Sequence, residues 1–411
     1  MKSKKLRNNL LILFFIIFFQ TEIYSTEFAY TEKKIDNYKI GLITNIPGTV
    51  YSVGVDYNNN IYANDFTNGY IYRFKIKDKK LDYSLINLDL KTNQLIVENI
   101  SFSEIKKKPG NFVKPHFVNF NKNENIVIVE SGTSPKADPK NPTAGKVREF
   151  NLNSGKFINE YKAPEIESFK LDYPNDKYGW DFPVAITYDD QGNSYITEFR
   201  AHKISKFEKN RFAGLIGYKN NNKEQELFYT DGKFKKEHRF GGLAFPHTLK
   251  VGPDKNIYIA DTVNDRILKY SFKGKYLGWI GKSENGNIIN TWTKEGKSIA
   301  GNELGAFDDP IDIFFIDDES MLVSDKNNNR LVLINLNGKS RYWLGKRKKI
   351  IQNDKNESWK NNGEPVASNG LIGFESPFSF VFKNNNLYVA DSNNNRIKII
   401  YNIKNLNYEK N

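Results

Sequence analysis

The chain has 411 residues, of which 27% are charged and 39% hydrophobic, and its formal net charge is +13. It contains no cysteine, which excludes disulfide bonds, thiolate metal ligands and a lipid-modified N-terminal cysteine. Apart from Lys346–Lys349 the basic residues form no dense block, so nucleic acid is not an expected partner, and the charge fits either a solvated surface or a face that attracts an anionic partner.

The first 25 residues have the layout of an export signal. Four basic residues precede the ten consecutive apolar residues Leu10–Phe19, and a polar stretch follows. The apolar run is short for a membrane span. Ser25 would suit the end of a cleaved signal, but Ile23 is bulkier than usual, so a signal peptide and an uncleaved signal anchor both stay open. We expect a periplasmic or secreted protein that contacts a membrane only through an uncleaved N-terminal segment.

A strand-like run, Tyr38–Ile43, comes next, and six copies of one phrase follow it. The clearest copy has Pro246, then Asn256–Asp261, then Arg266–Leu268. We call the first position the Pro slot; an acidic residue follows it by 15 positions in five copies and by 14 in the last. In chain order the slot, acidic and following basic or aromatic positions are Val50/Asp65/Tyr70, Pro115/Glu130/Lys146, Pro183/Glu198/Lys203, Pro246/Asp261/Arg266, Pro310/Asp325/Arg330 and Pro377/Asp391/Arg396. Self-similarity at this period indicates a repeat architecture.

Each copy predicts four antiparallel strands. In the fourth copy these are His247–Val251, Ile257–Ala260, Ile267–Phe272 and Tyr276–Ile280, with Gly274 in the last turn because a tight hairpin needs a positive φ. A four-stranded sheet buries little surface alone, so six of them must pack face to face around an axis. The predicted fold is therefore all-β, a six-bladed β-propeller of four-stranded antiparallel blades.

The two ends of the chain predict how the ring closes. The sixth copy supplies strands at Phe378–Phe382, Leu387–Ala390 and Ile397–Ile400 but has no convincing fourth strand. Tyr38–Ile43 is a strand without a partner. We expect this N-terminal strand to complete the sixth blade, because closure removes an exposed sheet edge.

Several motifs resemble those of NHL-repeat propellers. They are the Pro-slot strands, the ends at Asp261, Asp325 and Asp391, the Asp-x-x-Asn-x-Arg turns that follow them, and linkers such as Gly305–Pro310. The resemblance implies one NHL-type propeller domain over residues 26–411. It leaves the activity open, since propellers have many functions. Because the Asp and Arg positions recur in several blades, we interpret them as parts of the turn rather than as a site.

Two of the four histidines predict a site. His116 and His247 directly follow the Pro slot in blades two and four, so both should reach the central channel. Two imidazoles there would bind zinc or copper if a third ligand joined them, and Asp312 in blade five is the candidate. The alternative is a pair that forms hydrogen bonds within the channel or holds a water molecule.

The histidine spacing is similar to that of the peptidyl-hydroxyglycine amidating lyases, which are propellers with a three-histidine zinc site. The resemblance implies a third ligand in blade six, where this chain has Phe378, which cannot bind a metal. It also implies a Tyr and an Arg beside the metal, where this chain has Arg200 and Thr262. These departures argue against the lyase reaction in its known form.

Two tryptophans lie in long polar connections between blades, Trp292 in Lys282–Asp309 and Trp359 in Lys346–Ser376. Exposed rings there would stack on a sugar or another flat ligand, whereas buried rings would hold their loops in place. Both interpretations stay open. Trp279 and Trp343, at matching positions of two fourth strands, are expected to pack in the core.

The sequence thus predicts an exported, monomeric propeller that binds a protein, glycan or small molecule. The expected site is the end of the channel reached by His116, Arg200, His247 and Asp312, beside the insertion Ser131–Gly145. No cofactor is required by any motif, and zinc is the one that the histidines suggest. The alternative is a metal-dependent lyase or hydrolase with His116 and His247 as ligands.

Overall fold

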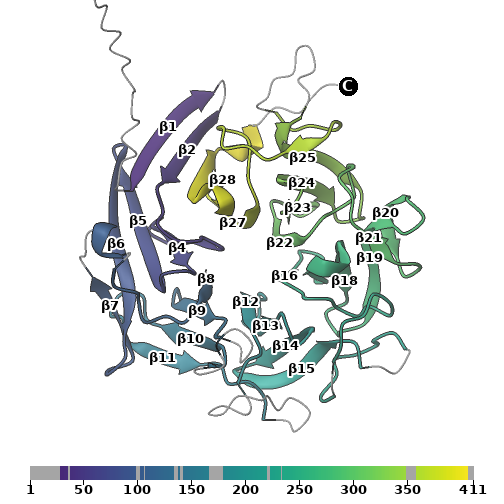
Figure 1. The fold of residues 1–411 in the computed structure, drawn as a ribbon. Helices are drawn as coiled ribbons and strands as arrows, with labels where there is room; N and C mark the ends of the chain where they lie inside the picture. The colour runs from purple at the N-terminus through teal and green to yellow at the C-terminus, as the bar shows by residue number, and fades with distance from the viewer. Residues whose placement is uncertain are drawn as a thin grey trace, which may run out of the picture.

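Six antiparallel sheets stand in a ring around a central axis (Figure 1). This computed structural model describes residues 28–35, 38–98, 102–105, 107–133, 138, 142–165, 179–219, 223–232, 234–348 and 358–405. The predicted all-β, six-bladed propeller is confirmed. The predicted signal, residues 1–25, lies outside the described residues. Across those ranges, no helix combines the length and the hydropathy that a membrane crossing needs.

Each repeat of the sequence forms one blade, with its first strand nearest the axis (Figure 1). The strands of blades one to three are β3 (Val53–Val55), β4 (Ile61–Asp65), β5 (Tyr70–Lys77), β6 (Lys80–Asp89) and β7 (Gln94–Glu98); β8 (Pro115–Phe120), β9 (Ile126–Glu130), β10 (Lys146–Phe150) and β11 (Phe157–Glu160); β12 (Pro183–Tyr188), β13 (Ser194–Glu198), β14 (Lys203–Glu208) and β15 (Arg211–Gly217). A short helix, α1 (Phe102–Ile105), follows blade one.

Blades four to six follow the same order and carry the 3-10 turns η2 (Thr262–Asn264), η3 (Ser392–Asn394) and η4 (Ile403–Asn405). Their strands are β16 (Leu249–Val251), β17 (Ile257–Asp261), β18 (Arg266–Tyr270), β19 (Tyr276–Ser283), β20 (Ile288–Thr293) and β21 (Ser298–Ile299); β22 (Pro310–Phe315), β23 (Ser320–Asp325), β24 (Arg330–Asn335), β25 (Ser340–Arg347) and β26 (Pro365–Val366); β27 (Pro377–Lys383), β28 (Asn386–Asp391), β29 (Arg396–Tyr401), β2 (Tyr38–Thr44) and β1 (Ala29–Ile35).

Two details of the predicted blades need correction. Blades one, four, five and six carry outer strands beyond the expected four. The first strand of blade four begins at Leu249 rather than at His247, although the His247 amide still donates to the Ala260 carbonyl at 3.1 Å. The predicted turn glycine, Gly274, does adopt a positive φ, 87°.

The ring closes through the N-terminal strand, as predicted. β2 pairs antiparallel with β29, with Ile40 opposite Ile400, and β1 adds a further strand outside β2 (Figure 1). The hydroxyl of Tyr30 in β1 lies 2.9 Å from the hydroxyl of Tyr401 in β29, so this contact passes over β2. The first described strands of the chain therefore complete its last blade, which leaves no unpaired third strand in blade six.

The repeated Asp and Arg form a buried clamp on the linker between blades. In blade five the Asp325 carboxylate accepts hydrogen bonds from Arg330 Nε at 2.7 Å, Asn328 Nδ2 at 2.9 Å and the Asp308 amide at 2.8 Å. Arg330, which is 0% exposed, also donates to the Ala306 carbonyl at 2.9 Å. The same Asp–Arg bond occurs in blades four and six, at Asp261–Arg266 and Asp391–Arg396. The structural interpretation of these residues is confirmed.

A side-chain donor near the acidic end of each blade bonds to a carbonyl at or beside the Pro slot of the next blade. The six bonds are Asn64 to Pro115, Ser131 to Pro183, Thr197 to His247, Thr262 to Pro310, Ser324 to Pro377 and Ser392 to Val50. The last bond joins the sixth blade to the first. This ring fixes the backbone from which the side chains at the axis project.

Candidate functional site at one end of the channel

The aromatic residues that directly follow four of the Pro slots meet at the axis. We call this set the axial cluster; it comprises Tyr51, His116, His247 and Phe378. Ring centroids lie 5.0 Å apart for His116 and His247, 4.8 Å for His247 and Phe378, and 4.3 Å for Tyr51 and Phe378. Because blades two, four and six are not neighbours, their side chains can touch only at the axis. The predicted convergence of the histidines is confirmed.

Both histidines are buried and keep one nitrogen without a partner. His116 is 4% exposed and His247 3%, and the Nδ1 atom of each is buried without a hydrogen bond. Burial lowers the pKa of His116 to about 3. Burial also lowers the pKa of His247 well below its ordinary value, with smaller contributions from His116 and the Lys326 charge. Both imidazoles are therefore neutral near pH 7, and each can offer Nδ1 to a ligand.

The predicted completion of a metal site by Asp312 is wrong. Its carboxylate is 0% exposed and accepts hydrogen bonds from the Ile313 amide at 2.9 Å and the Phe380 amide at 3.1 Å. Within the described ranges, neither histidine belongs to a group of three His, Cys, Asp or Glu with ligand atoms within 4.8 Å of one another. A protein zinc site normally has at least three protein ligands. The residues present therefore do not fit zinc.

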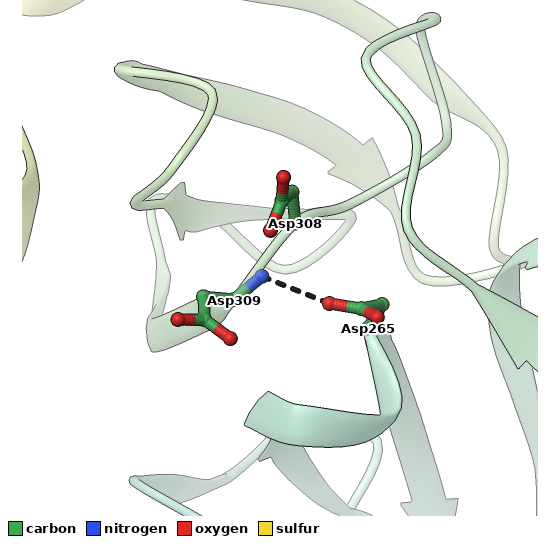
Figure 2. A group of neighbouring side chains, drawn as sticks. All are labelled: Asp265, Asp308 and Asp309. Carbon is green, nitrogen blue, oxygen red and sulfur yellow. Dashed lines mark hydrogen bonds between the residues drawn. The ribbon is translucent and has the colours of Figure 1, made fainter.

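One acidic group does meet that distance criterion, and it lies between blades four and five (Figure 2). Its members are Asp265, Asp308 and Asp309, all partly exposed. The Asp309 amide donates to Asp265 Oδ1 at 3.0 Å, and Asp309 Oδ2 pairs with Lys326 Nζ at 2.8 Å. Burial, followed by the neighbouring acids, raises the pKa of Asp265 to about 7.

The hydrogen bond between Asp265 and the linker amide has a counterpart at the interface of blades five and six, where an asparagine replaces the aspartate. There Asn329 Oδ1 accepts from the Ser376 amide at 2.9 Å. Asp265 thus performs the role in the linker turn that an asparagine performs in the next blade. The acidic group therefore has a structural role: Asp265 holds the linker turn, and Lys326 neutralises Asp309.

Four further aromatic rings stand around the axial cluster and were missed by the sequence reasoning. We call Phe66, Phe182, Phe199 and Phe245 the mouth ring; all four are half-buried. Centroid distances are 4.9 Å for Phe66 and Tyr51, 6.1 Å for Phe199 and His247, and 4.9 Å for Phe199 and Phe245.

The positions of the mouth ring in the repeat could have revealed it. Phe66 and Phe199 directly follow the acidic position of their blades, and Phe182 and Phe245 directly precede the Pro slot. Both positions lie at the same end of the blade as the position after the Pro slot, which the histidines occupy. Phe182 and Phe245 have φ values of 57° and 52°, as the residue before the slot does in three other blades, so the repeat imposes this turn.

Arg200 lies at this end of the channel, as expected. Its guanidinium is 4.3 Å from the Phe182 ring centroid. Asp181 is close enough for its pKa to respond to the Arg200 charge, although burial is the larger influence and raises that pKa. The base of the predicted insertion is here too, since Thr133 and Thr143 form a β-bridge directly after blade two's acidic position. Most of the residues between them lie outside the described ranges.

The two linker tryptophans are not exposed rings at this end. Trp359 is 2% exposed and belongs to the core between blades five and six, so of its two interpretations the ligand-stacking one is wrong and the loop-holding one stands. Trp292 lies in β20, on the outside of the ring, where its indole N–H donates to the Leu336 carbonyl at 2.8 Å and its ring contacts Tyr258. Trp279 and Trp343 are 1% and 0% exposed, which confirms their predicted packing role.

The opposite end of the channel holds a cavity of about 380 Å³ between the first turns of blades three, four and five. Two of its acidic side chains have partners. Asp189 accepts from Asn193 Nδ2 at 2.8 Å, and Asp190 forms an ion pair with Lys255. The histidine end differs from this one in presenting two buried nitrogen atoms without hydrogen-bond partners, Nδ1 of His116 and Nδ1 of His247.

Comparisons with known proteins bear on the fold. No protein-family model matches the chain, and no curated protein matches its sequence. A catalytically inactive virginiamycin B lyase from Staphylococcus aureus with quinupristin is 11% identical, with a TM-score of 0.46 over 91% of this chain and 99% of that one. An auxiliary nutrient binding protein from Bacteroides ovatus is 13% identical, with a TM-score of 0.46 over 91% and 77%.

A gluconolactonase from Xanthomonas campestris is 9% identical, with a TM-score of 0.44 over 88% of this chain and 89% of that one. These three proteins differ in what their names say they do. At such identities and TM-scores the likeness carries no argument about activity.

Proposed function

We propose that this protein is an exported, NHL-type propeller that acts as a binding module, with a small-molecule site at the histidine end of its channel. One observation carries the proposal: two buried, neutral imidazoles, each with an unpartnered Nδ1, lie in contact beneath a ring of half-buried aromatic side chains. An unpaired buried polar atom costs about 1–3 kcal/mol. A ligand that bonds to these nitrogens would recover part of that cost.

Binding is favoured over catalysis by the same histidines. General acid–base catalysis works best when the pKa of the group lies near the operating pH. Burial holds the pKa of His116 near 3, so this imidazole is a weak base and carries no proton to donate at neutral pH. The donor set also lacks a third metal ligand within the described ranges. The site therefore favours recognition over a lyase or hydrolase reaction.

A small molecule is favoured over a protein or a glycan chain by the depth of the unpaired groups. Both Nδ1 atoms are inaccessible to solvent in the free protein, so a ligand must enter the channel and displace aromatic side chains to reach them. Export is supported by the basic and apolar N-terminal sequence, residues 1–25. We infer a monomer that samples its ligand outside the cytoplasm.

Ligand-observed NMR with a fixed panel of probes tests the proposal. The panel is phenol, indole, benzoate, benzamide and methyl glucoside, and the variant is His116→Phe with His247→Phe. Phenylalanine is chosen because Phe378 occupies the same position in blade six, so a flat ring of somewhat larger size is kept while the nitrogens are lost. His238→Phe, in a linker away from the axis, is the matched control.

We expect at least one probe to bind the native protein and the control, and to lose about tenfold or more in affinity for the double variant. Equal binding to all three proteins would place the site elsewhere. Binding of no probe would overturn the proposal of an accessible small-molecule site.

A further inference from the structure

Three phenylalanines of the mouth ring each have a cationic side chain over the face of their aromatic ring. Arg200 lies 4.3 Å from the centroid of Phe182, and Lys114 lies 4.8 Å from that of Phe66. Lys236 lies 5.8 Å from the centroid of Phe245. We call Lys114, Arg200 and Lys236 the rim cations. Each is held by the negative face of a ring, which leaves its N–H donors directed away from the ring.

The rim cations lack carboxylate partners. Across the described ranges none of the three forms an ion pair within 4.0 Å, whereas Lys255 and Lys326, in surface turns of the ring, each have one. Asp181 lies near enough to Arg200 for the Arg200 charge to lower its pKa, although burial is the larger influence and raises that pKa. On the far side of the mouth, Asp309 is paired with Lys326 and belongs to the acidic group with Asp265 and Asp308. The side of the mouth that carries the rim cations is thus basic, and the acidic group lies apart from it, between blades four and five.

The floor beneath the rim has the opposite character. It consists of the neutral His116 and His247 with Tyr51 and Phe378, whose rings pack within 4.3–5.0 Å of one another along the cluster. A charged group would be poorly solvated there. A flat apolar ring would instead stack on these side chains, and a polar group on its edge would reach an unpaired Nδ1. The rim therefore suits an anionic group, and the floor suits the aromatic ring of the same molecule.

We propose that the histidine end of the channel selects small aromatic carboxylates, with the carboxylate at the rim cations and the ring against the axial cluster. This inference rests on the proposed function and narrows it to a class of ligand. Arg200 is the specificity-determining residue, because its planar guanidinium can bond a carboxylate with two N–H groups while it stays stacked on Phe182. Lys114 and Lys236 contribute mainly long-range attraction.

The test compares 6-hydroxy-2-naphthoate, whose hydroxyl can reach an unpaired Nδ1, with its neutral analogue 6-hydroxy-2-naphthamide, using calorimetric titration of the full exported chain. The variants are Arg200→Gln, the double-phenylalanine variant of His116 and His247, and the control Lys255→Gln at the opposite channel end. We expect the native protein to prefer the carboxylate by about tenfold, Arg200→Gln to lose most of that preference, and Lys255→Gln to retain it. Added salt should weaken the carboxylate alone.

The outcomes separate the two proposals. Equal affinity for carboxylate and amide, with both lost in the double-phenylalanine variant, would overturn the ligand class and leave the site standing. An unchanged preference in Arg200→Gln would overturn the role of the rim. If neither naphthalene binds while a probe of the smaller panel does, the class is wrong. If carboxylate binding survives intact in the double-phenylalanine variant, the site itself is wrong.

Discussion

Replacing both axial histidines with phenylalanine should make the protein more resistant to acid. Burial lowers the pKa of His116 from 6.5 to about 3, so between these values the unfolded chain binds a proton that the folded chain does not. Stability that is complete above about pH 6.5 is therefore lost as the pH falls toward 3. At about pH 4 the shift amounts to at most roughly 3 kcal/mol for His116, at about 1.4 kcal/mol per pH unit. His247 adds to the same effect, because burial lowers its pKa too.

Urea unfolding at a series of pH values measures this effect. The relevant quantity is the difference in unfolding free energy between the variant and the native chain, because carboxylates that titrate in both proteins cancel. We expect this difference to be flat above about pH 6.5 and to grow by several kcal/mol toward about pH 4 in favour of the variant. His238→Phe, a partly buried site, should show a smaller change. A pH-independent difference would refute the burial of two neutral imidazoles.

Deletion of residues 1–50 removes β1 and β2 and should lower the melting temperature or cause aggregation, as followed by thermal unfolding with light scattering; a fragment as stable as residues 26–411 would contradict the closure. Asp325→Ala should cost about 3–5 kcal/mol in urea unfolding because it leaves Arg330 buried and unpaired, whereas Ala at the exposed Asp317 should cost almost nothing. Lys398→Leu should raise the free energy of unfolding at neutral pH, because burial lowers the pKa of Lys398 to about 7 and so makes its charged form costly in the fold. As the pH rises above about 7, the native chain should become more stable relative to this variant. Unfolding free energies that change in parallel with pH in the two proteins would disprove this prediction.

The fold was predictable because the repeat exposes it. The six blades follow from where the Pro slot and the acidic position recur, and the partner of Tyr38–Ile43 follows from the missing fourth strand of the sixth copy. The outer strands, such as β7 and β20, were not predicted because they belong to linkers that differ from blade to blade. Their pairing depends on the neighbouring sheet and not on a local pattern.

The site was predictable where the repeat fixes a direction. His116 and His247 share one position and therefore meet at the axis. Asp312 is one residue further along its strand, and successive side chains of a strand face opposite sides, so it turns into the interface with blade six and bonds to Phe380.

Trp359 shows the other limit of the sequence. Its linker is polar, so the sequence left open whether the ring is exposed or buried. Next to it, however, the Lys360 backbone pairs with Trp343 of β25, with N–O distances of 2.7 and 2.8 Å, and this contact draws Trp359 into the core. A pairing between residues 17 positions apart in a non-repeating linker leaves no periodic trace.

The central claim is that the two axial histidines are neutral and contact the ligand. Long-range ¹H–¹⁵N correlation spectra of the imidazoles test it directly, since the chain has only four histidines and single His→Phe variants assign them. We predict that the signals of His116 and His247 stay those of neutral rings down to about pH 5 and shift when 6-hydroxy-2-naphthoate is added, while His238 does not respond to the probe. Titration of both axial rings near pH 6.5, about the ordinary pKa of histidine, or signals unmoved by a bound probe would contradict the account.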